Sequence, residues 1–296
     1  MLKQRFGGKR MIELINSIVQ GILIGGLYAL FAAGLSLVFG IMRIVNLSHG
    51  DLIVLGSFLA FFTVSTLTVP LWLMVVIIPL AMGVIGYAIQ RSLLNKTIGP
   101  DVLPPLLITF GLSIILQNGL LQIFTADNRK LDFGAIEVMS VEIGGIAMGW
   151  YAILIFLIAV TVITGLQFIS YHTRLGRLLR ATTDDPEIAK LMGVKTEHIF
   201  AIAMAIAMII CGIAAILFAA WTSFTPLSGP SRLLIAFEVV VIGGIGSIWG
   251  TLVGGIILGV AQALGGYFDP AWQTLAGHIV FVIILVLRPI FVKGFR

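Results

Sequence analysis

The chain has 296 residues, of which 59% are apolar and only 10% are charged. A soluble domain carries about 25% charged residues because water must solvate its surface, so this composition excludes a soluble globular protein. Most of the surface must face lipid instead, which indicates an integral membrane protein. The net charge of +5 does not indicate a nucleic-acid-binding protein, since the basic residues are scattered between apolar runs.

The single cysteine, Cys211, lies within an apolar run. It permits neither an intrachain disulfide nor a cysteine-based metal site, so we expect a small buried residue, and we expect no metal and no cofactor. The basic residues at the start resemble the first part of a signal peptide, but no short small-residue cleavage site follows them. We therefore expect an uncleaved start, with Met11 as an alternative first residue.

Six apolar runs have about the length that a membrane-spanning helix needs. They cover residues 52–67, 71–89, 105–124, 150–169, 199–221 and 271–287. Two further runs, 12–45 and 233–264, are too long for one ordinary crossing and are interrupted by glycine. Each could form one long helix or two shorter pieces that meet at a break.

Charge placement favours two pieces, because short cytoplasmic loops collect lysine and arginine. Ten crossings place both termini and residues 172–198 in the cytoplasm, and leave only Arg129, Lys130 and Arg232 of the basic residues outside. Eight crossings would put the basic N-terminus and the basic segment 172–198 on opposite sides. Half-helices that end inside the membrane describe the shortest crossings equally well.

The sequence therefore predicts an all-α integral membrane protein with about eight to ten transmembrane segments, some of them short or broken. We expect a single transmembrane domain over residues 1–296, with an external acidic loop at 125–149 and a cytoplasmic loop at 172–198.

A group of polar residues ends the first long run. It consists of Arg43, Asn46, Ser48, His49 and Asp51. Ser48 and Asp51 have the spacing of a capping box and could start the helix that follows. Ionisable groups at membrane depth usually face a bundle interior or a water-filled path, so the same five residues are candidates for a translocation pathway.

The second long run is rich in glycine. Glycines four residues apart place small side chains on a shared helix face, which predicts close packing against other helices. The residues concerned are Gly246, Gly250 and Gly254, together with Gly255 and Gly259.

Glu238 is a carboxylate within the same apolar run, so it is either a buried structural partner or a pathway residue. The two interrupted runs also resemble each other, because residues 38–41 and 241–244 each precede a break and a second apolar piece. Such a weak internal repeat is a sequence signature of transporters.

The polar segment 172–198 contains a short predicted helix. Asp184 can cap this helix and Gly193 can end it, while Ile188, Leu191 and Met192 lie on one side. A helix of this kind docks into a groove on a partner protein or lies on the membrane surface.

These features resemble a known family, the permease subunits of ATP-binding-cassette importers for branched-chain amino acids, and in particular the smaller of the two paired permeases. The likeness rests on residues 34–56 with their Arg-Ile-Val-Asn-x-x-His-Gly-Asp core, on the glycine pattern of 243–255, and on 180–193. Residues 187–193 are similar to the Glu-Ala-Ala-x-x-x-Gly coupling motif, from which Ile188 departs. Leu47, Ser48 and Trp249 are further departures, which bear on the substrate more than on the fold.

The resemblance implies that Arg180, Glu187, Ala189 and Gly193 belong to a loop helix that sits in a cleft of a cytoplasmic ATPase subunit. It also implies a second homologous permease, a periplasmic substrate-binding protein, a small amino-acid substrate and a place in the bacterial inner membrane. The chain contains no G-x-x-x-x-G-K-[ST] phosphate loop, so we do not expect an enzyme, and ATP hydrolysis would belong to another chain.

Import of leucine, isoleucine, valine or a related amino acid is the leading hypothesis. The same family architecture also carries urea and short amides. A secondary transporter coupled to ions through Asp51 and Glu238 is a second hypothesis, and a membrane subunit without a pathway is a third. The loop at 180–193 separates the first two hypotheses, because a secondary transporter needs no docking helix for an ATPase.

Overall fold

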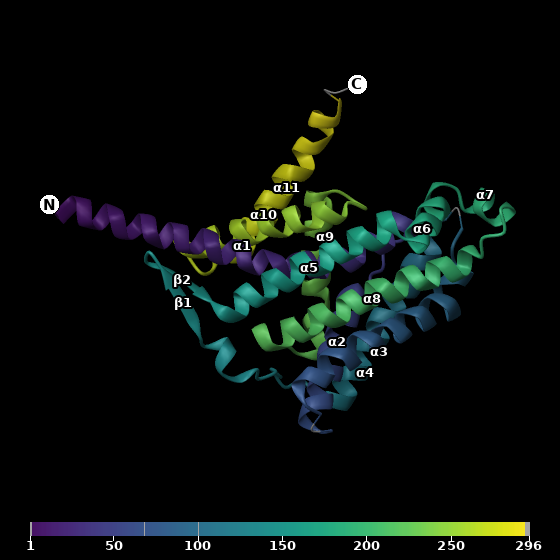
Figure 1. Cartoon of the computed structure of the whole chain (residues 1–296), viewed down its shortest axis with the longest axis horizontal. Coiled ribbons are helices and arrows are strands. Elements are labelled where there is room, and N and C mark those ends of the chain that lie inside the picture. The colour runs from purple at the N-terminus through teal and green to yellow at the C-terminus, as the bar shows by residue number, and fades with distance from the viewer. Residues whose placement is uncertain (1, 68, 100, 294–296) are drawn as a thin grey trace.

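The computed structural model describes residues 2–67, 69–99 and 101–293 (Figure 1). Within that part of the chain, seven helices are long and apolar enough to cross a membrane, and His49–Ser65 and Trp272–Leu287 are shorter apolar helices. The prediction of an all-α integral membrane protein is therefore confirmed.

The helices follow the apolar runs of the sequence closely. They are α1 (Leu2–Met42), α2 (His49–Ser65), α3 (Leu71–Ser92), α4 (Leu103–Phe124), α5 (Trp150–His172), α6 (Arg174–Asp184), α7 (Pro186–Leu191), α8 (Thr196–Trp221), α9 (Gly229–Gly243), α10 (Ile248–Phe268) and α11 (Trp272–Lys293). The apolar segments of α1 and α8 are 83% and 72% buried, whereas those of α4 and α5 are 17% and 28% buried. The core is therefore built on α1 and α8, and α4 and α5 present apolar side chains to lipid.

The predicted loop at 125–149 contains a small β-hairpin. Strands β1 (Ser140–Ile143) and β2 (Ile146–Gly149) pair antiparallel, and Gly144 and Gly145 form the turn with φ of 62° and 86°. Glycine adopts these positive φ angles without a steric penalty, as tight hairpin turns require. We call this side of the molecule the hairpin end, and the side that carries α6 and α7 the α7 end (Figure 1).

The first long run is one continuous helix, so the prediction that residues 12–45 form two pieces is wrong. Its glycines do not break α1, because they lie where another helix approaches it. A Cβ atom on Gly25 would lie 2.7 Å from the carbonyl oxygen of Gly255 in α10, and a Cβ on Gly21 would lie 2.6 Å from the Cα of Val260. These glycines provide close helix packing and not a hinge.

The second long run does break. Gly244 and Gly246, between α9 and α10, have φ of 98° and 76°, a conformation that side chains other than glycine rarely adopt. Because one long run breaks and the other does not, the seven long and two shorter apolar helices of the described residues lie within the predicted range of eight to ten segments.

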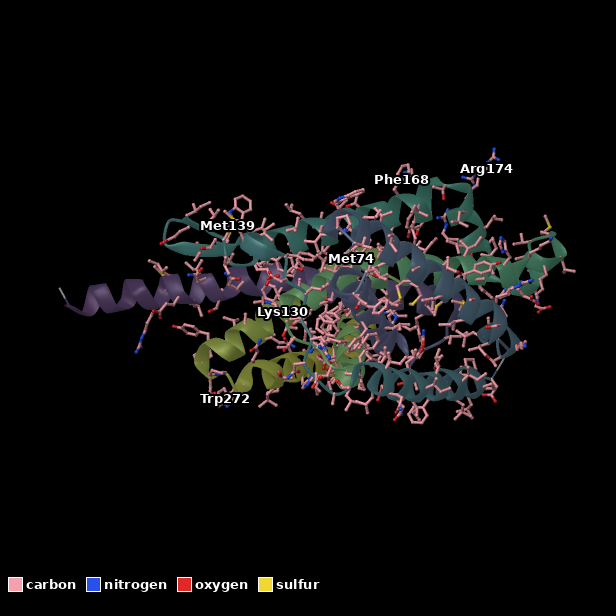
Figure 2. The ribbon with its side chains drawn as sticks, turned by 90° about the horizontal axis from the view of Figure 1, so that it is seen from below. Met74, Lys130, Met139, Phe168, Arg174 and Trp272 are labelled. Atoms are coloured by element: carbon pink, nitrogen blue, oxygen red, sulfur yellow. The ribbon has the colours of Figure 1, made fainter. Side chains whose placement is uncertain are left out.

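The N-terminal part of α1 lies at the hairpin end. The amide nitrogen of Ala147 in β2 donates to Asn16 Oδ1 at 3.0 Å, and Gln20 Nε2 donates to the Ala147 carbonyl at 2.7 Å. Figure 2 shows Met139 on the side of the N-terminal part of α1, and Arg174 at the opposite end. The prediction that the basic N-terminus shares a side with residues 172–198 is therefore wrong.

The last helix, α11, runs away from the hairpin end, as expected for a C-terminus on the side opposite the hairpin (Figure 1). Helix α11 begins at the hairpin end, where Gln273 shares a cavity wall with Asn16, and it runs away from that end. The last three residues, including the basic Arg296 that we expected in the cytoplasm, lie outside the described residues.

Helices α1 to α3 form one group, and helices α8 to α10 form a second group that runs in the opposite direction. Helix α1 packs along α10 and α3 packs along α8, while α2 contacts α8 and α9 contacts α1. Helix α1 runs from the hairpin end to the α7 end, and α8 runs the opposite way (Figure 1). Helices α1 to α3 thus correspond to α8 to α10 with inverted direction, as in transporters built from inverted repeats. This correspondence differs from the predicted match between residues 38–41 and 241–244, which end α1 and α9.

Candidate functional site

Helices α2 and α9 both begin inside the protein, and their first residues touch. A Cβ atom on Gly50 would collide with the carbonyl oxygen of Gly229, and a Cβ on Gly229 would collide with the carboxylate of Asp51. Only glycine fits at either position without moving a helix. The chain reaches this crossing through residues 43–48 from the α7 end and through residues 222–228 from the hairpin end.

Three of the predicted pathway residues hold the first break together. Asn46 Oδ1 accepts from the Ser48 amide at 3.0 Å and from Ser48 Oγ at 2.7 Å. His49 Nε2 contacts the Phe31 carbonyl in α1 at 2.8 Å, and its ring lies 3.7 Å from Cys211 Sγ. These side chains satisfy backbone groups that the break would otherwise leave unpaired in a protein interior. Cys211 is buried, as expected.

The predicted capping box does not form. Ser48 precedes α2 but makes no capping hydrogen bond, because its hydroxyl group is bound to Asn46. The carboxylate of Asp51 binds another helix, because its Oδ2 accepts from Ser113 Oγ of α4 at 2.5 Å. Gln117 Nε2 in turn donates to Ser113 Oγ at 3.0 Å. The local spacing fits a cap, but Ser48 binds Asn46 in the preceding loop and Asp51 binds Ser113 of α4 instead.

Asp51 is 2% exposed, and its second oxygen, Oδ1, has no hydrogen-bond partner among the described residues. This oxygen faces Gly229, the first residue of α9. The start of a helix carries a partial positive charge that stabilises a nearby carboxylate. Asp51 therefore links α2, α4 and the first turn of α9.

Glu238 lies apart from this group and has a partner of its own. Its Oε1 is paired with His278 Nδ1 of α11, while Oε2 is buried without a hydrogen-bond partner among the described residues. The side chain of Glu238 is 1% exposed and that of His278 is 35% exposed. His278 is a functional candidate that the sequence did not reveal, because it lies forty residues from Glu238 and no spacing pattern connects the two.

Further polar groups surround Glu238. Tyr28 donates from its hydroxyl to Gln262 Oε1 at 2.7 Å, and it interacts electrostatically with both Arg232 and Glu238. Arg232 lies in α9 with its guanidinium group 4.6 Å from the centre of the Phe218 ring. It is therefore part of the helical bundle and not of an external loop, as the sequence had suggested.

Arg43 does not join the buried polar group. It is exposed, with φ of 55°, and lines a cavity of about 580 Å³ at the α7 end. Thr183, Asp184 and Pro186, at the junction of α6 and α7, line the same cavity. The α6–α7 junction and the segment that leads into α2 therefore line the same cavity.

The short helix α7 forms where the sequence predicts it, but Asp185 caps it instead of Asp184. Asp185 Oδ1 accepts from the amides of Glu187 and Ile188 at 2.9 and 3.0 Å. Gly193 follows the helix with φ of 84°. Glu187 is exposed and forms a long ion pair with Lys190, with 3.8 Å between their charged atoms.

One face of α7 is apolar and open. Ile188, Leu191 and Met192 are 59%, 86% and 81% exposed, whereas Ala189 packs inward with 4% exposure. Arg180 in α6 binds the Ser170 carbonyl and stacks on the Tyr171 ring, with its guanidinium carbon 5.0 Å from the ring centre. Arg180 therefore fixes α6 to the end of α5 and leaves the α7 face unobstructed.

The glycines of α10 pack against two neighbouring helices, α9 and α1. Gly250 and Gly254 face α9, where a Cβ on Gly254 would lie 2.5 Å from the Val239 carbonyl oxygen. Gly255 and Gly259 face the backbone of α1. Gly246 belongs to the turn before α10 and contacts Gly40. Within the described residues, no group of three or more His, Cys, Asp or Glu side chains could hold a metal ion.

Two halves of opposite direction, broken helices that meet inside the protein and an exposed short helix at one end define a membrane transporter subunit. The family model for the permease component of branched-chain amino acid transport systems matches residues 17–287. The chain belongs to this family.

Individual relatives match along nearly the whole chain. The high-affinity branched-chain amino acid transport permease BraD of Pseudomonas aeruginosa is 29% identical over 293 residues, with 95% of each chain covered. The permease LivH of Escherichia coli is 27% identical over 305 residues, with 97% of each chain covered. The fructose import permease FrcC of Rhizobium meliloti is 29% identical over 202 residues, covering 62% of this chain and 55% of that protein. No solved structure matches.

Proposed function

We propose that this chain is a permease subunit of an ATP-binding-cassette importer that moves leucine, isoleucine, valine or a related small amino acid across the bacterial inner membrane. Substrate would arrive from a periplasmic binding protein, a second homologous permease would complete the pathway, and separate cytoplasmic ATPase subunits would hydrolyse ATP. The observation that carries the proposal is the family match over residues 17–287 to branched-chain amino acid permeases. The open apolar face of α7 supports the part of it that concerns the ATPase.

In this proposal the α7 end lies in the cytoplasm and the hairpin end lies outside. Short loops rich in lysine and arginine stay in the cytoplasm, and the α7 end carries Arg91, Arg174, Arg177, Lys190 and Lys195. The N-terminal part of α1 then lies on the outer side, so the charge difference between the two sides is smaller than the sequence suggested.

The coupling route starts at Glu187, Ala189 and Gly193, which would sit in the ATPase cleft. Closure of the ATPase would move α7 and the α6–α7 junction. Arg43 shares a cavity wall with that junction, so the motion would reach the segment that leads into α2. The shared cavity wall brings the two segments close together, which is the proximity that the proposed coupling needs.

Within the membrane, Asp51 and Glu238 are the strongest pathway candidates. Each is a buried carboxylate with one unpaired oxygen, which costs free energy unless a ligand, water or a partner chain binds it in another state. Asn46, Ser48 and His49 contribute by holding the break at which α2 begins. Arg43 contributes at the cytoplasmic entrance to the same break.

The test is uptake by the chain reconstituted in proteoliposomes with the permease, ATPase and binding protein encoded beside it. We expect ATP-dependent uptake of radiolabelled leucine that excess isoleucine and valine abolish and excess urea leaves unchanged. Competition by urea or acetamide instead would assign the substrate to short amides. Uptake driven by an ion gradient without ATP would overturn the importer assignment altogether.

A further inference from the structure

A basic cavity opens at the α7 end, away from both polar groups of the candidate site. It has a volume of about 460 Å³ and lies between the end of α3 and the start of α8. Its wall includes Arg91, Lys190, Lys195 and His198, with Glu197 as the one acidic side chain in that wall. The coupling proposal uses none of these side chains.

The positive charges of the cavity are only partly neutralised. Arg91 pairs with Glu197 at 3.4 Å, and both side chains are more than half exposed. Lys190 reaches Glu187 only at 3.8 Å. Lys195 is exposed and has no ion pair among the described residues. The cavity therefore keeps an excess of positive charge that fits an anion.

An apolar stripe leads from this cavity along α3. Val84, Leu80 and Val76 follow one another at helical spacing and are 70%, 58% and 52% exposed, and Arg91 lies two turns beyond Val84 on the same side. A stripe of large exposed apolar side chains on a membrane-spanning helix faces lipid chains. The boundary between the stripe and the cavity is therefore where a lipid headgroup would lie.

We propose that this cavity is a binding site for an anionic phospholipid, whose phosphate group lies between Arg91, Lys195 and His198 and whose acyl chains follow the stripe on α3. Basic pockets beside membrane helices recognise anionic headgroups in this way. The stripe favours a lipid over a soluble anion, because a free phosphate has no use for it. It also favours a lipid over the ATPase, which cannot cover side chains inside the membrane.

The test compares lipids on the purified full chain in a mild detergent after delipidation. Native mass spectrometry counts bound lipid during titration with dioleoyl phosphatidylglycerol or dioleoyl phosphatidylcholine. The variant R91Q/K195Q removes two positive charges from the cavity. The variant K96Q/R177Q is the matched control, because it removes two exposed charges at the same end that do not line the cavity.

We expect the wild-type chain and the control to bind phosphatidylglycerol in preference to phosphatidylcholine, and the cavity variant to bind phosphatidylglycerol about thirtyfold more weakly. Equal binding of both lipids, or an equal loss in the control, would overturn the proposal. Displacement by millimolar inorganic phosphate would assign the site to a free anion. Unchanged lipid binding with lost ATPase association would assign the surface to the ATPase. The unfolding temperature without lipid, unchanged between variants, excludes a folding defect as the cause.

Discussion

Close contact between α1 and α10 makes a quantitative prediction for Gly25→Ala. The new Cβ would lie 2.7 Å from both the Gly255 carbonyl oxygen and the Ile256 Cα, whereas ordinary contact begins at 3.4 Å. Both obstacles are backbone atoms that cannot rotate away, so the two helices must separate by roughly the difference. Overpacking of this kind costs about 1–3 kcal/mol, and the better helix propensity of alanine returns up to about 1 kcal/mol.

A net loss of about 1–2 kcal/mol corresponds to a fall of about 2–3 °C in unfolding temperature, because the entropy of unfolding of 296 residues is about 0.6 kcal/mol per degree. Circular dichroism of the purified chain in detergent measures it. Gly165→Ala in α5 is the matched control, because nothing lies within 4 Å of a Cβ at that position, and we expect its unfolding temperature to stay the same or rise. Equal unfolding temperatures for the two variants would refute the reasoning that these glycines are required by helix contact.

Two further predictions concern transport, and a third concerns the orientation in the membrane. Glu238→Gln replaces the carboxyl group that binds His278 and should lower uptake in the reconstituted system, and normal uptake would exclude Glu238 from the pathway. Gly193→Leu puts a side chain on a residue with φ of 84°, and should leave ATP hydrolysis running while uptake falls; unchanged uptake would end the coupling assignment. Cysteines at Glu13 and Ala135 should react with an impermeant thiol reagent in intact cells, whereas a cysteine at Thr183 should not, and the buried Cys211 gives little background. Reaction at Thr183 and protection at Ala135 would reverse the proposed orientation.

Hydropathy was enough to find the membrane helices, but not to decide where they break. Gly25 and Gly244 look alike in sequence, since both lie in glycine-rich apolar runs. One lies against the backbone of α10 and stays helical, and the other has φ of 98° and ends a helix. Gly25 lies in an unbroken helix packed against α10, and that information comes from residues more than two hundred positions away.

Charge counting failed for a related reason. The rule that basic loops stay in the cytoplasm is a statement about averages, and it favoured ten crossings over eight because ten place the basic N-terminus and residues 172–198 on the same side. The direction of α1 follows from its packing along α10, and its N-terminal part binds the hairpin through Asn16 and Gln20, which contact the backbone of Ala147. A charge count contains no information about such packing between neutral residues.

In the candidate site, too, the sequence predicted some residues and could not predict the residues that bind them. Asp51 and Glu238 stood out because a carboxylate in an apolar run needs a partner or a function. The partners themselves, Ser113 and His278, lie on helices 62 and 40 residues away, and no spacing rule connects them. The sequence therefore identified the acidic residues that matter and could not identify what binds them.

The inverted arrangement places these two carboxylates in corresponding helices. Asp51 belongs to α2 and binds α4, while Glu238 belongs to α9 and binds α11, and the repeat relates α2 to α9. The positions within the two helices differ, so the similarity is one of architecture and not of sequence. In both places one carboxylate oxygen is bound by an outer helix and the other is buried without a partner among the described residues. Leaving such an oxygen without a hydrogen bond costs about 1–3 kcal/mol, and at Asp51 the partial positive charge at the start of α9 offsets part of that cost. The proposal that the two carboxylates belong to the pathway rests on this cost, and uptake by the Glu238→Gln variant tests it.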